Sequence, residues 1–239
     1  MKQIWKKRSA LFCMIAVLLT AVVPAIPVAA EEAAAAETTV TNGWDANKTH
    51  YYQNGKAVTG LKKIKGSYYY FTNKGKVVKN KLKKVKQGSK TYTFYFGKNG
   101  AAYKAAADKF TVNCKVCKIN GKYYGFDAKS HAVTGIWAGT NGKIYAFGKN
   151  GAMNAEKTKK LRAIGKVGKK SRTLLADVKK AYGKPKKERI EKNSCNPFAG
   201  GKTSDYHDYI LTYDNVEVQM TKNIRTGVYH MNGAGGRDK

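Results

Sequence analysis

Beyond Cys13, three cysteines and four histidines are the residues of this chain best able to carry covalent or metal chemistry. Cys114 and Cys117 have the C-x-x-C spacing of redox centres and of half a zinc site. A zinc site needs two more ligands, and the nearest histidine, His131, belongs to no second C-x-x-C or H-x-x-x-H pattern. No predicted helix N-terminus is present to lower a thiol pKa. The pair is therefore interpreted as a local disulfide, with no metal and no cofactor expected.

Cys195 is the unpaired cysteine of this interpretation. An odd thiol count in an exported chain leaves one thiol free or bonded to a second molecule, so a disulfide between two chains through Cys195 stays open. A nucleophile pair with His207 is conceivable, but closeness in sequence does not give the geometry that such a pair needs. The sequence has no G-x-S-x-G, H-E-x-x-H, phosphate-loop or dinucleotide pattern, and its acidic residues are few and scattered. The expectation is a protein without enzymatic activity.

The first thirty residues have the pattern of a secretory signal peptide. Four basic residues precede an apolar run from Ala10 to Val23, and small residues at 28–30 offer a cleavage site. The apolar run is short for a membrane span, and an uncleaved anchor is the alternative. No second span follows, so the chain is expected to be secreted, without a transmembrane anchor after cleavage. Residues 31–42 are interpreted as a linker.

The formal net charge is +31. Removing residues 1–30, which hold four basic and no acidic residues, leaves +27. Such a charge attracts polyanions in a salt-dependent way. Lysine outnumbers arginine, and lysine suits diffuse attraction better than the bidentate contacts that read bases. Together with export, this favours an envelope polymer such as teichoic acid over nucleic acid. The alternative is that the lysines only keep an aromatic-rich chain soluble.

One pattern recurs five times between residues 43 and 155. Each copy has an apolar start, a basic turn, an aromatic strand, an Asn/Gly turn and a short apolar strand. Asn-Gly pairs tolerate positive φ and are typical of tight hairpins. A single hairpin cannot bury its own apolar face, so repeated hairpins stack into a solenoid. The copies are residues 44–60, Leu61–Asn80, Leu82–Lys104, 105–135 and a fifth that starts at Trp137 and ends near Ala155.

These copies resemble the cell-wall-binding repeats of the choline-binding and glucan-binding surface proteins. Leu61–Asn80 and Trp137–Ala155 follow that motif in length and order, and its closing Val-Thr-Gly stands at 58–60 and 133–135. The resemblance implies a hairpin solenoid that holds a secreted protein to cell-wall glycopolymer: teichoic acid, peptidoglycan-associated glycan or glucan.

The sequence departs from the choline-binding branch of that family. There, two tryptophans from neighbouring repeats and a third aromatic ring enclose the quaternary ammonium. Here the opening tryptophan is replaced by Leu61 and Leu82, and the second by Tyr68 and Ile144. A complete cage is therefore not expected at most junctions, and the aromatic residues are interpreted as platforms for sugar rings or as hairpin core. The candidate ligand-binding residues are Trp44, Tyr51, Tyr52, Tyr68, Tyr69, Tyr70, Trp137 and Tyr145.

From Glu156 the aromatic spacing stops. Apolar residues four apart predict a helix over Ser171–Tyr182, ended by Gly183 and Pro185. Three strands of an antiparallel meander follow. They are Asp208–Tyr213, Val216–Thr221 and Gly227–Met231. This part faintly resembles small helix-plus-sheet modules of envelope proteins, which bind other molecules.

The predicted fold class is mainly β: a hairpin solenoid over 43–155, a small α+β domain over 156–231 with one helix on the sheet, and a disordered tail over 232–239. The predicted function is non-enzymatic binding of cell-wall polysaccharide through aromatic repeats and a basic surface. The alternative is an accessory or inhibitory module, in which the C-terminal domain binds an envelope protein and the repeats anchor it.

Overall fold

Antiparallel hairpins follow one another along the first part of the chain. The computed structural model describes residues 40–164, 169–195 and 201–239, so the predicted signal peptide and most of the linker lie outside it. The first unit is β1 (Gly43–Trp44), β2 (Tyr51–Gln53) and β3 (Lys56–Ala57). Four two-stranded units follow: β4 (Gly60–Ile64) with β5 (Ser67–Phe71), β6 (Lys81–Gln87) with β7 (Lys90–Phe96), β8 (Lys115–Ile119) with β9 (Lys122–Phe126), and β10 (Gly135–Ala138) with β11 (Ile144–Phe147). The prediction of hairpin repeats is confirmed.

Each two-stranded unit ends in the same turn. A phenylalanine closes the second strand and forms an isolated bridge to the residue six positions later. The pairs are Phe71–Val77, Phe96–Ala102, Phe126–Ala132 and Phe147–Met153. The backbone N–H of that later residue then donates to a carbonyl of the preceding unit, as from Ala102 to Tyr68 at 2.8 Å and from Ala132 to Thr93 at 2.7 Å. This repeated hydrogen bond joins consecutive hairpins. Each hairpin is therefore stabilised by its neighbours, and the array needs no single large core.

Strand alternation gives each hairpin two contact faces. Along β5, Tyr68 and Tyr70 pack toward the third unit, against Phe94 and Phe96. The intervening Tyr69 packs toward the first unit and lies with its ring centroid 5.1 Å from that of Trp44. Because successive side chains point to opposite faces, one aromatic strand serves two junctions.

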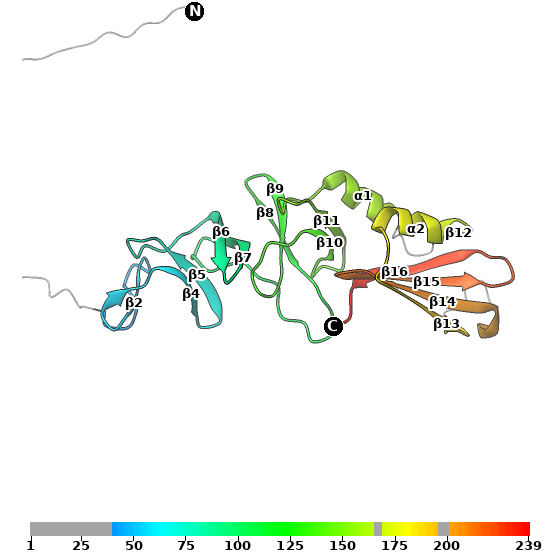
Figure 1. Cartoon of the computed structure of the whole chain (residues 1–239), viewed down its shortest axis with the longest axis horizontal. Coiled ribbons are helices and arrows are strands. Elements are labelled where there is room, and N and C mark those ends of the chain that lie inside the picture. The colour runs from blue at the N-terminus through cyan, green and yellow to red at the C-terminus, as the bar shows by residue number, and fades with distance from the viewer. Residues whose placement is uncertain (1–39, 165–168, 196–200) are drawn as a thin grey trace, which may run out of the picture. The chain divides into compact units, whose positions relative to one another are not determined.

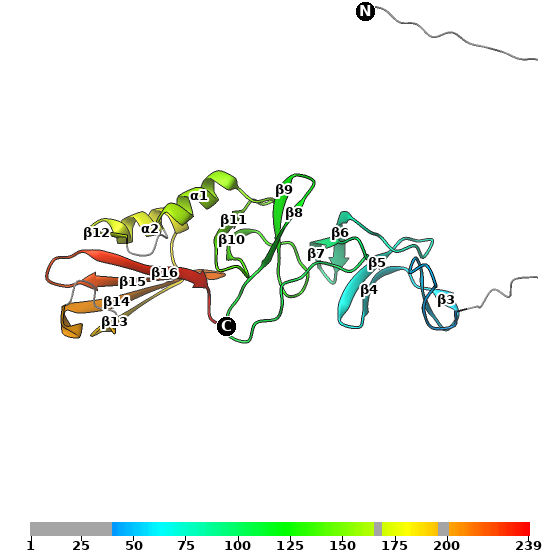
Figure 2. The same cartoon turned by 180° about the vertical axis from the view of Figure 1, so that it is seen from behind.

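The C-terminal part is a five-stranded antiparallel sheet with two helices packed on one face (Figures 1 and 2). The strand order is β12-β16-β15-β14-β13. The strands are β12 (Lys170–Ser171), β13 (Lys187–Lys192), β14 (Tyr206–Thr212), β15 (Val216–Asn223) and β16 (Tyr229–Gly236). The helices are α1 (Ala155–Ile164) and α2 (Leu174–Tyr182), and a 3-10 turn, η1, covers Thr203–Asp205. The predicted meander corresponds to β14, β15 and β16.

Helix α2 confirms most of the helix prediction. Leu174, Val178 and Tyr182 are buried, as the four-residue spacing indicates. The helix begins at Leu174, three residues later than predicted, because Ser171 lies in β12. Helix α1 was not predicted, because it buries only Thr158 and Leu161 and so has almost no apolar stripe.

The prediction of a disordered tail over 232–239 is wrong. The register of β16 continues along β15 as far as Gly236, which pairs with Val216. Arg237 and Lys239 then bond to the loop after the third hairpin, where the Val112 N–H donates to the Arg237 carbonyl at 2.8 Å. The glycine-rich sequence of this segment favoured the prediction of disorder. The segment still forms a strand, because the hydrogen bonds of a β-ladder join backbone groups and do not depend on side chains.

The last hairpin and the C-terminal part share one hydrophobic cluster. Ala138, Ile144 and Ala146 are buried together with Leu161 and Leu174. The domain boundary predicted at 155/156 stays a prediction, and this core extends across it. None of the helices in the described part of the chain has the length and hydropathy to cross a bilayer.

Candidate functional site

Trp44, Tyr51 and Tyr69 lie together at the junction of the first and second units. The Trp44 ring centroid is 5.4 Å from that of Tyr51 and 5.1 Å from that of Tyr69, and both pairs are edge-to-face. The three rings line a cavity of about 430 Å³, which Lys48 and Lys65 also border. The rings are half-buried, so they are fixed in place and still reach solvent. Three of the residues predicted from the sequence therefore form one aromatic pocket.

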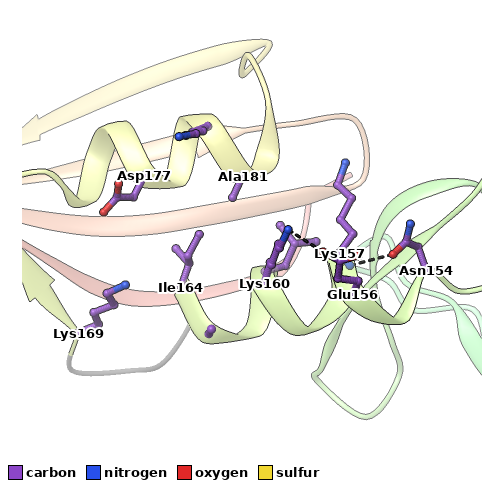
Figure 3. A pocket seen from close by; sticks show the side chains of 11 residues that line it. Asn154, Glu156, Lys157, Lys160, Ile164, Lys169, Asp177 and Ala181 are labelled. Atoms are coloured by element: carbon purple, nitrogen blue, oxygen red, sulfur yellow. Dashed lines mark hydrogen bonds and ion pairs between the residues drawn. The ribbon is translucent and has the colours of Figure 1, made fainter.

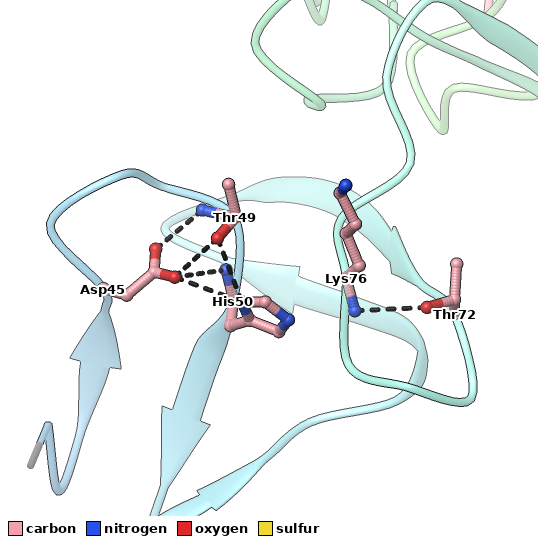
Figure 4. Close-up of polar contacts among 5 residues, drawn as sticks. All are labelled: Asp45, Thr49, His50, Thr72 and Lys76. Carbon is pink, nitrogen blue, oxygen red and sulfur yellow. Dashed lines mark hydrogen bonds and ion pairs between the residues drawn. The ribbon is translucent and has the colours of Figure 1, made fainter.

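A tight polar loop between β1 and β2 holds Trp44 and Tyr51 in position (Figure 4). The Asp45 carboxylate accepts hydrogen bonds from the Thr49 N–H and hydroxyl, each at 2.6 Å, and from the His50 N–H at 3.1 Å. Burial opposes ionisation of Asp45, but these hydrogen bonds outweigh it and hold the pKa of its carboxyl well below the usual range. In the adjacent turn, also drawn in Figure 4, the Lys76 N–H donates to the Thr72 hydroxyl. The Val77 N–H then bonds to the Thr49 carbonyl, so the two loops brace each other.

The other tyrosines of the predicted set are divided among different surroundings. Tyr68 lines a separate cavity at the next junction. Tyr70 packs against Phe96, and the Lys83 ammonium lies 4.3 Å from the Tyr70 ring centroid. Tyr52 lies near His50, with their ring centroids 6.4 Å apart. These residues do not form one continuous binding strip.

Trp137 and Tyr145, both from the last hairpin, do not join the first pocket. Trp137 is half-buried and borders a cavity next to the loop at residues 106–113. Tyr145 is only 8% exposed, and the Arg162 guanidinium lies 4.3 Å from its ring centroid. Helix α1, which was not predicted, packs against this hairpin and leaves Tyr145 little open surface, and its role as a ligand platform stays a prediction.

The thiols do not form the predicted Cys114–Cys117 disulfide, and Cys114, Cys117 and Cys195 are all free. Cys117 lies in β8 and Cys114 is the residue directly before that strand, so the backbone between them is extended. Three residues of extended chain separate Cα atoms by about 10 Å, beyond the reach of a disulfide. Burial raises the pKa of Cys114 to about 12 and that of Cys117 to about 11. Cys195 is exposed, so its predicted link to a second chain stays a prediction.

Within the described ranges, no three His, Cys, Asp or Glu side chains could hold a metal ion together.

A cavity that the sequence did not indicate lies at the junction of the second, third and fourth units. Its volume is about 520 Å³. It is lined by Lys63, Gly66, Tyr68, Gln87, Tyr92, Lys104, Ala128, Lys129, Ser130 and His131. These residues come from three repeats, and no spacing in the sequence brings them together. The alignment of the copies could have indicated Ser130, which occupies a turn position held by glycine in the other two-stranded units.

A further cavity, of about 750 Å³, lies between α1 and α2 (Figure 3). Leu161, Ile164 and Ala181 contribute apolar surface to it, and lysines from both helices surround it. Lys160 is held by an ion pair to Glu156, with Nζ 2.8 Å from Oε1. The arrangement is an open groove with a basic rim.

Comparison with known protein families identifies one matching segment. Residues 58–106 match the family model described as a choline-binding repeat. The segment contains all of the second and third hairpin units, including Tyr68, Tyr69 and Tyr70. The resemblance to cell-wall-binding repeats is thereby confirmed. No curated protein matches the chain.

Several solved structures share short stretches of similar hairpins. Alternansucrase in complex with isomaltononaose is 26% identical, over 46% of this chain and 8% of that chain, with a TM-score of 0.29. Choline binding protein F from Streptococcus pneumoniae is 23% identical, over 47% and 38%, with a TM-score of 0.34. A modular endolysin in complex with a peptidoglycan analogue is 18% identical, over 49% and 38%, with a TM-score of 0.30. The matches span well under two thirds of these chains. With TM-scores this low, these structures support no conclusion about this chain. The resemblance to choline-binding repeats therefore depends on the family match at residues 58–106.

Proposed function

We propose that this chain, whose residues 58–106 are choline-binding repeats, is a secreted, non-enzymatic protein that binds cell-wall polysaccharide. The observation that carries the proposal is the aromatic pocket formed by Trp44, Tyr51 and Tyr69. Fixed aromatic rings that still reach solvent bury the apolar face of a sugar ring at little entropic cost. The basic surface adds long-range attraction to the anionic polymers of the wall.

The same pocket disfavours a quaternary ammonium ligand. Lys48 and Lys65 border it, and no acidic side chain is among its lining residues. A bound cation would gain from the ring faces but would lie near two ammonium groups of the same sign. A neutral or anionic sugar meets no such repulsion. The proposed ligand is therefore a glycan of the wall and not choline.

Co-sedimentation with purified bacterial cell wall tests this proposal. Trp44→Leu removes the aromatic face, and leucine already stands at the equivalent opening position in Leu61 and Leu82, so the fold accommodates it. Loss of one ring stack worth about 1–1.5 kcal/mol weakens binding about tenfold. The matched control is Phe110→Ala, because Phe110 is an aromatic residue 77% exposed and outside the pocket. Equal retention of both variants contradicts the proposal.

The groove between α1 and α2 supports the second candidate, a C-terminal part that binds an envelope protein while the repeats anchor the chain. Ala163 is exposed and lines that groove, so Ala163→Arg fills it without disturbing the core. In this alternative the variant loses binding to the protein fraction of the envelope and keeps its binding to bare wall polymer. If Ala163→Arg is retained by both fractions, the alternative is contradicted, and the proposal of polysaccharide binding is unaffected.

A further inference from the structure

The cavity at the junction of the second, third and fourth units is held in shape by contacts among all three. The Ala132 N–H donates to the Thr93 carbonyl at 2.7 Å and fixes the turn after β9 against β7. Across the cavity, the Lys104 ammonium donates to the Gly66 carbonyl at 2.8 Å. The cavity is therefore preformed and does not depend on one flexible loop.

One wall of this cavity is a fixed pair of rings. Tyr92 and His131 stack face to face, with centroids 3.8 Å apart and planes 10° from parallel. His131 Nε2 is 2.9 Å from Gln87 Oε1, and Nδ1 is 3.6 Å from an Asp127 carboxylate oxygen, so the imidazole cannot rotate freely. Burial lowers the pKa of His131, more than Asp127 raises it. Tyr68 supplies a second aromatic surface to the cavity.

The charge of the lining has one sign. Lys63, Lys104 and Lys129 contribute ammonium groups, and no acidic side chain lines the cavity. The nearby Asp127 carboxylate already accepts the N–H groups of Lys129 and His131. Three ammonium groups around one cavity repel a cationic guest and attract an anionic one. Lys104 uses one of its three donors on Gly66, which leaves donors for a ligand.

Ser130 adds an unsatisfied donor to the same lining. It is 1% exposed, and its hydroxyl has no hydrogen-bond partner among the described residues. Its φ is +69°, at the turn position where Gly75, Gly100 and Gly151 stand in the other units. A non-glycine residue there is strained, and a shielded hydroxyl without a partner is rare in folded proteins. The unpartnered hydroxyl is accounted for if an acceptor oxygen enters the cavity.

We propose that this junction cavity binds an anionic sugar unit of the wall polymer, with its ring against Tyr68 and Tyr92 and its charged group among Lys63, Lys104 and Lys129. The anionic group is a phosphate or a carboxylate. This inference rests on the proposed polysaccharide-binding function and assigns it a second subsite, chemically distinct from the Trp44 pocket.

Isothermal titration of the chain from residue 31 to its end tests the proposal with four probes: N-acetylglucosamine 6-phosphate, glucuronic acid, neutral N-acetylglucosamine and inorganic phosphate. The sugar phosphate or the uronic acid is expected to bind at least about tenfold more tightly than the neutral sugar and than phosphate alone. The stronger of the two identifies the anionic group. A neutral sugar that binds equally well, or phosphate alone that binds equally well, overturns the proposal.

Matched lysine variants localise the binding. Lys104→Gln with Lys129→Gln removes two charges from the cavity. Lys79→Gln with Lys74→Gln removes two exposed charges at the equivalent positions of the second unit, and neither lines this cavity. The first pair is expected to weaken sugar-phosphate or uronic-acid binding about tenfold, and the second by less than about twofold. Equal losses overturn the proposal.

Ser130→Gly separates this subsite from general stability. Glycine relieves the positive φ and removes the hydroxyl, so the variant is expected to unfold at a higher temperature and to bind the anionic sugar about threefold more weakly. Unchanged or tighter binding contradicts the role of Ser130. If Trp44→Leu weakens wall retention as predicted while the Lys104/Lys129 variant behaves like its Lys74/Lys79 control, the proposed function stands and this inference fails.

Discussion

Gly100 and Gly151 occupy equivalent turns of two repeats, and they predict unequal effects of the same substitution. Their φ angles are +81° and +80°. A Cβ atom at Gly100 would lie 2.7 Å from Cγ2 of Val77, whereas at Gly151 the nearest atom is 3.7 Å away. Val77 is buried and its branched side chain has few rotamers. The backbone strain is therefore common to both sites, and the steric overlap belongs to Gly100 alone.

The expected losses follow from these two contributions. Alanine at positive φ costs about 1–2 kcal/mol at either site. The overlap at Gly100 adds about 1–3 kcal/mol, the usual cost of forcing extra volume into a packed core. Gly100→Ala should therefore lower the free energy of unfolding by about 2–5 kcal/mol and Gly151→Ala by about 1–2 kcal/mol.

Urea unfolding followed by near-ultraviolet circular dichroism measures the difference. Native-state hydrogen exchange adds a local readout, because the Ala102 and Met153 amides make the equivalent bonds to the preceding units. Faster exchange at Ala102 in Gly100→Ala, with little change at Met153 in Gly151→Ala, is the expected pattern. Equal destabilisation of the two variants refutes the packing argument and leaves only backbone strain.

Two further predictions concern titratable groups. The folded-state pKa of Asp45 is lowered, so its stabilising contribution is complete above the ordinary value of 3.8 and decreases progressively as pH falls from there through the folded-state pKa. The gap between the unfolding midpoints of the protein and of Asp45→Asn should therefore begin to narrow below about pH 4 and keep narrowing, and a constant gap down to pH 2 contradicts this. For the thiols, iodoacetamide at pH 8 should modify exposed Cys195 first and reach Cys114 and Cys117 only on unfolding, because burial raises both of their pKa values. Mass spectrometry of tryptic peptides gives the order, and rapid labelling of Cys117 in the native protein is the contrary result.

The repeats were predictable because their signals are local. Aromatic alternation and turn residues specify each hairpin within about ten positions, so the aromatic strand predicted in Leu61–Asn80 is found as β5 (Ser67–Phe71). The same locality explains the missed helix α1. Its Asn154 cap accepts the Lys157 N–H at 2.8 Å, which was a readable signal, but the helix has little apolar periodicity.

The sites were less predictable, because they are made of residues from different repeats. Trp44, Tyr51 and Tyr69 could be selected by type, but only packing decided that these three share a pocket. Tyr145 has the same residue type, but its burial was not predictable from the sequence, because the contact from Arg162 depends on how α1 packs. Lys104 and Ser130 meet in one cavity through the stacking of three hairpins, which no sequence spacing expresses.

Equilibrium co-sedimentation of the unmodified chain with purified cell wall tests the central claim most directly. The measurement uses wall before and after acid extraction of its anionic polymers, from low to high salt. We predict saturable retention on both preparations, with a salt-sensitive part that extraction removes and a salt-resistant part that Trp44→Leu removes. Absence of saturable retention on intact wall at low salt contradicts the proposal that this protein binds wall polysaccharide.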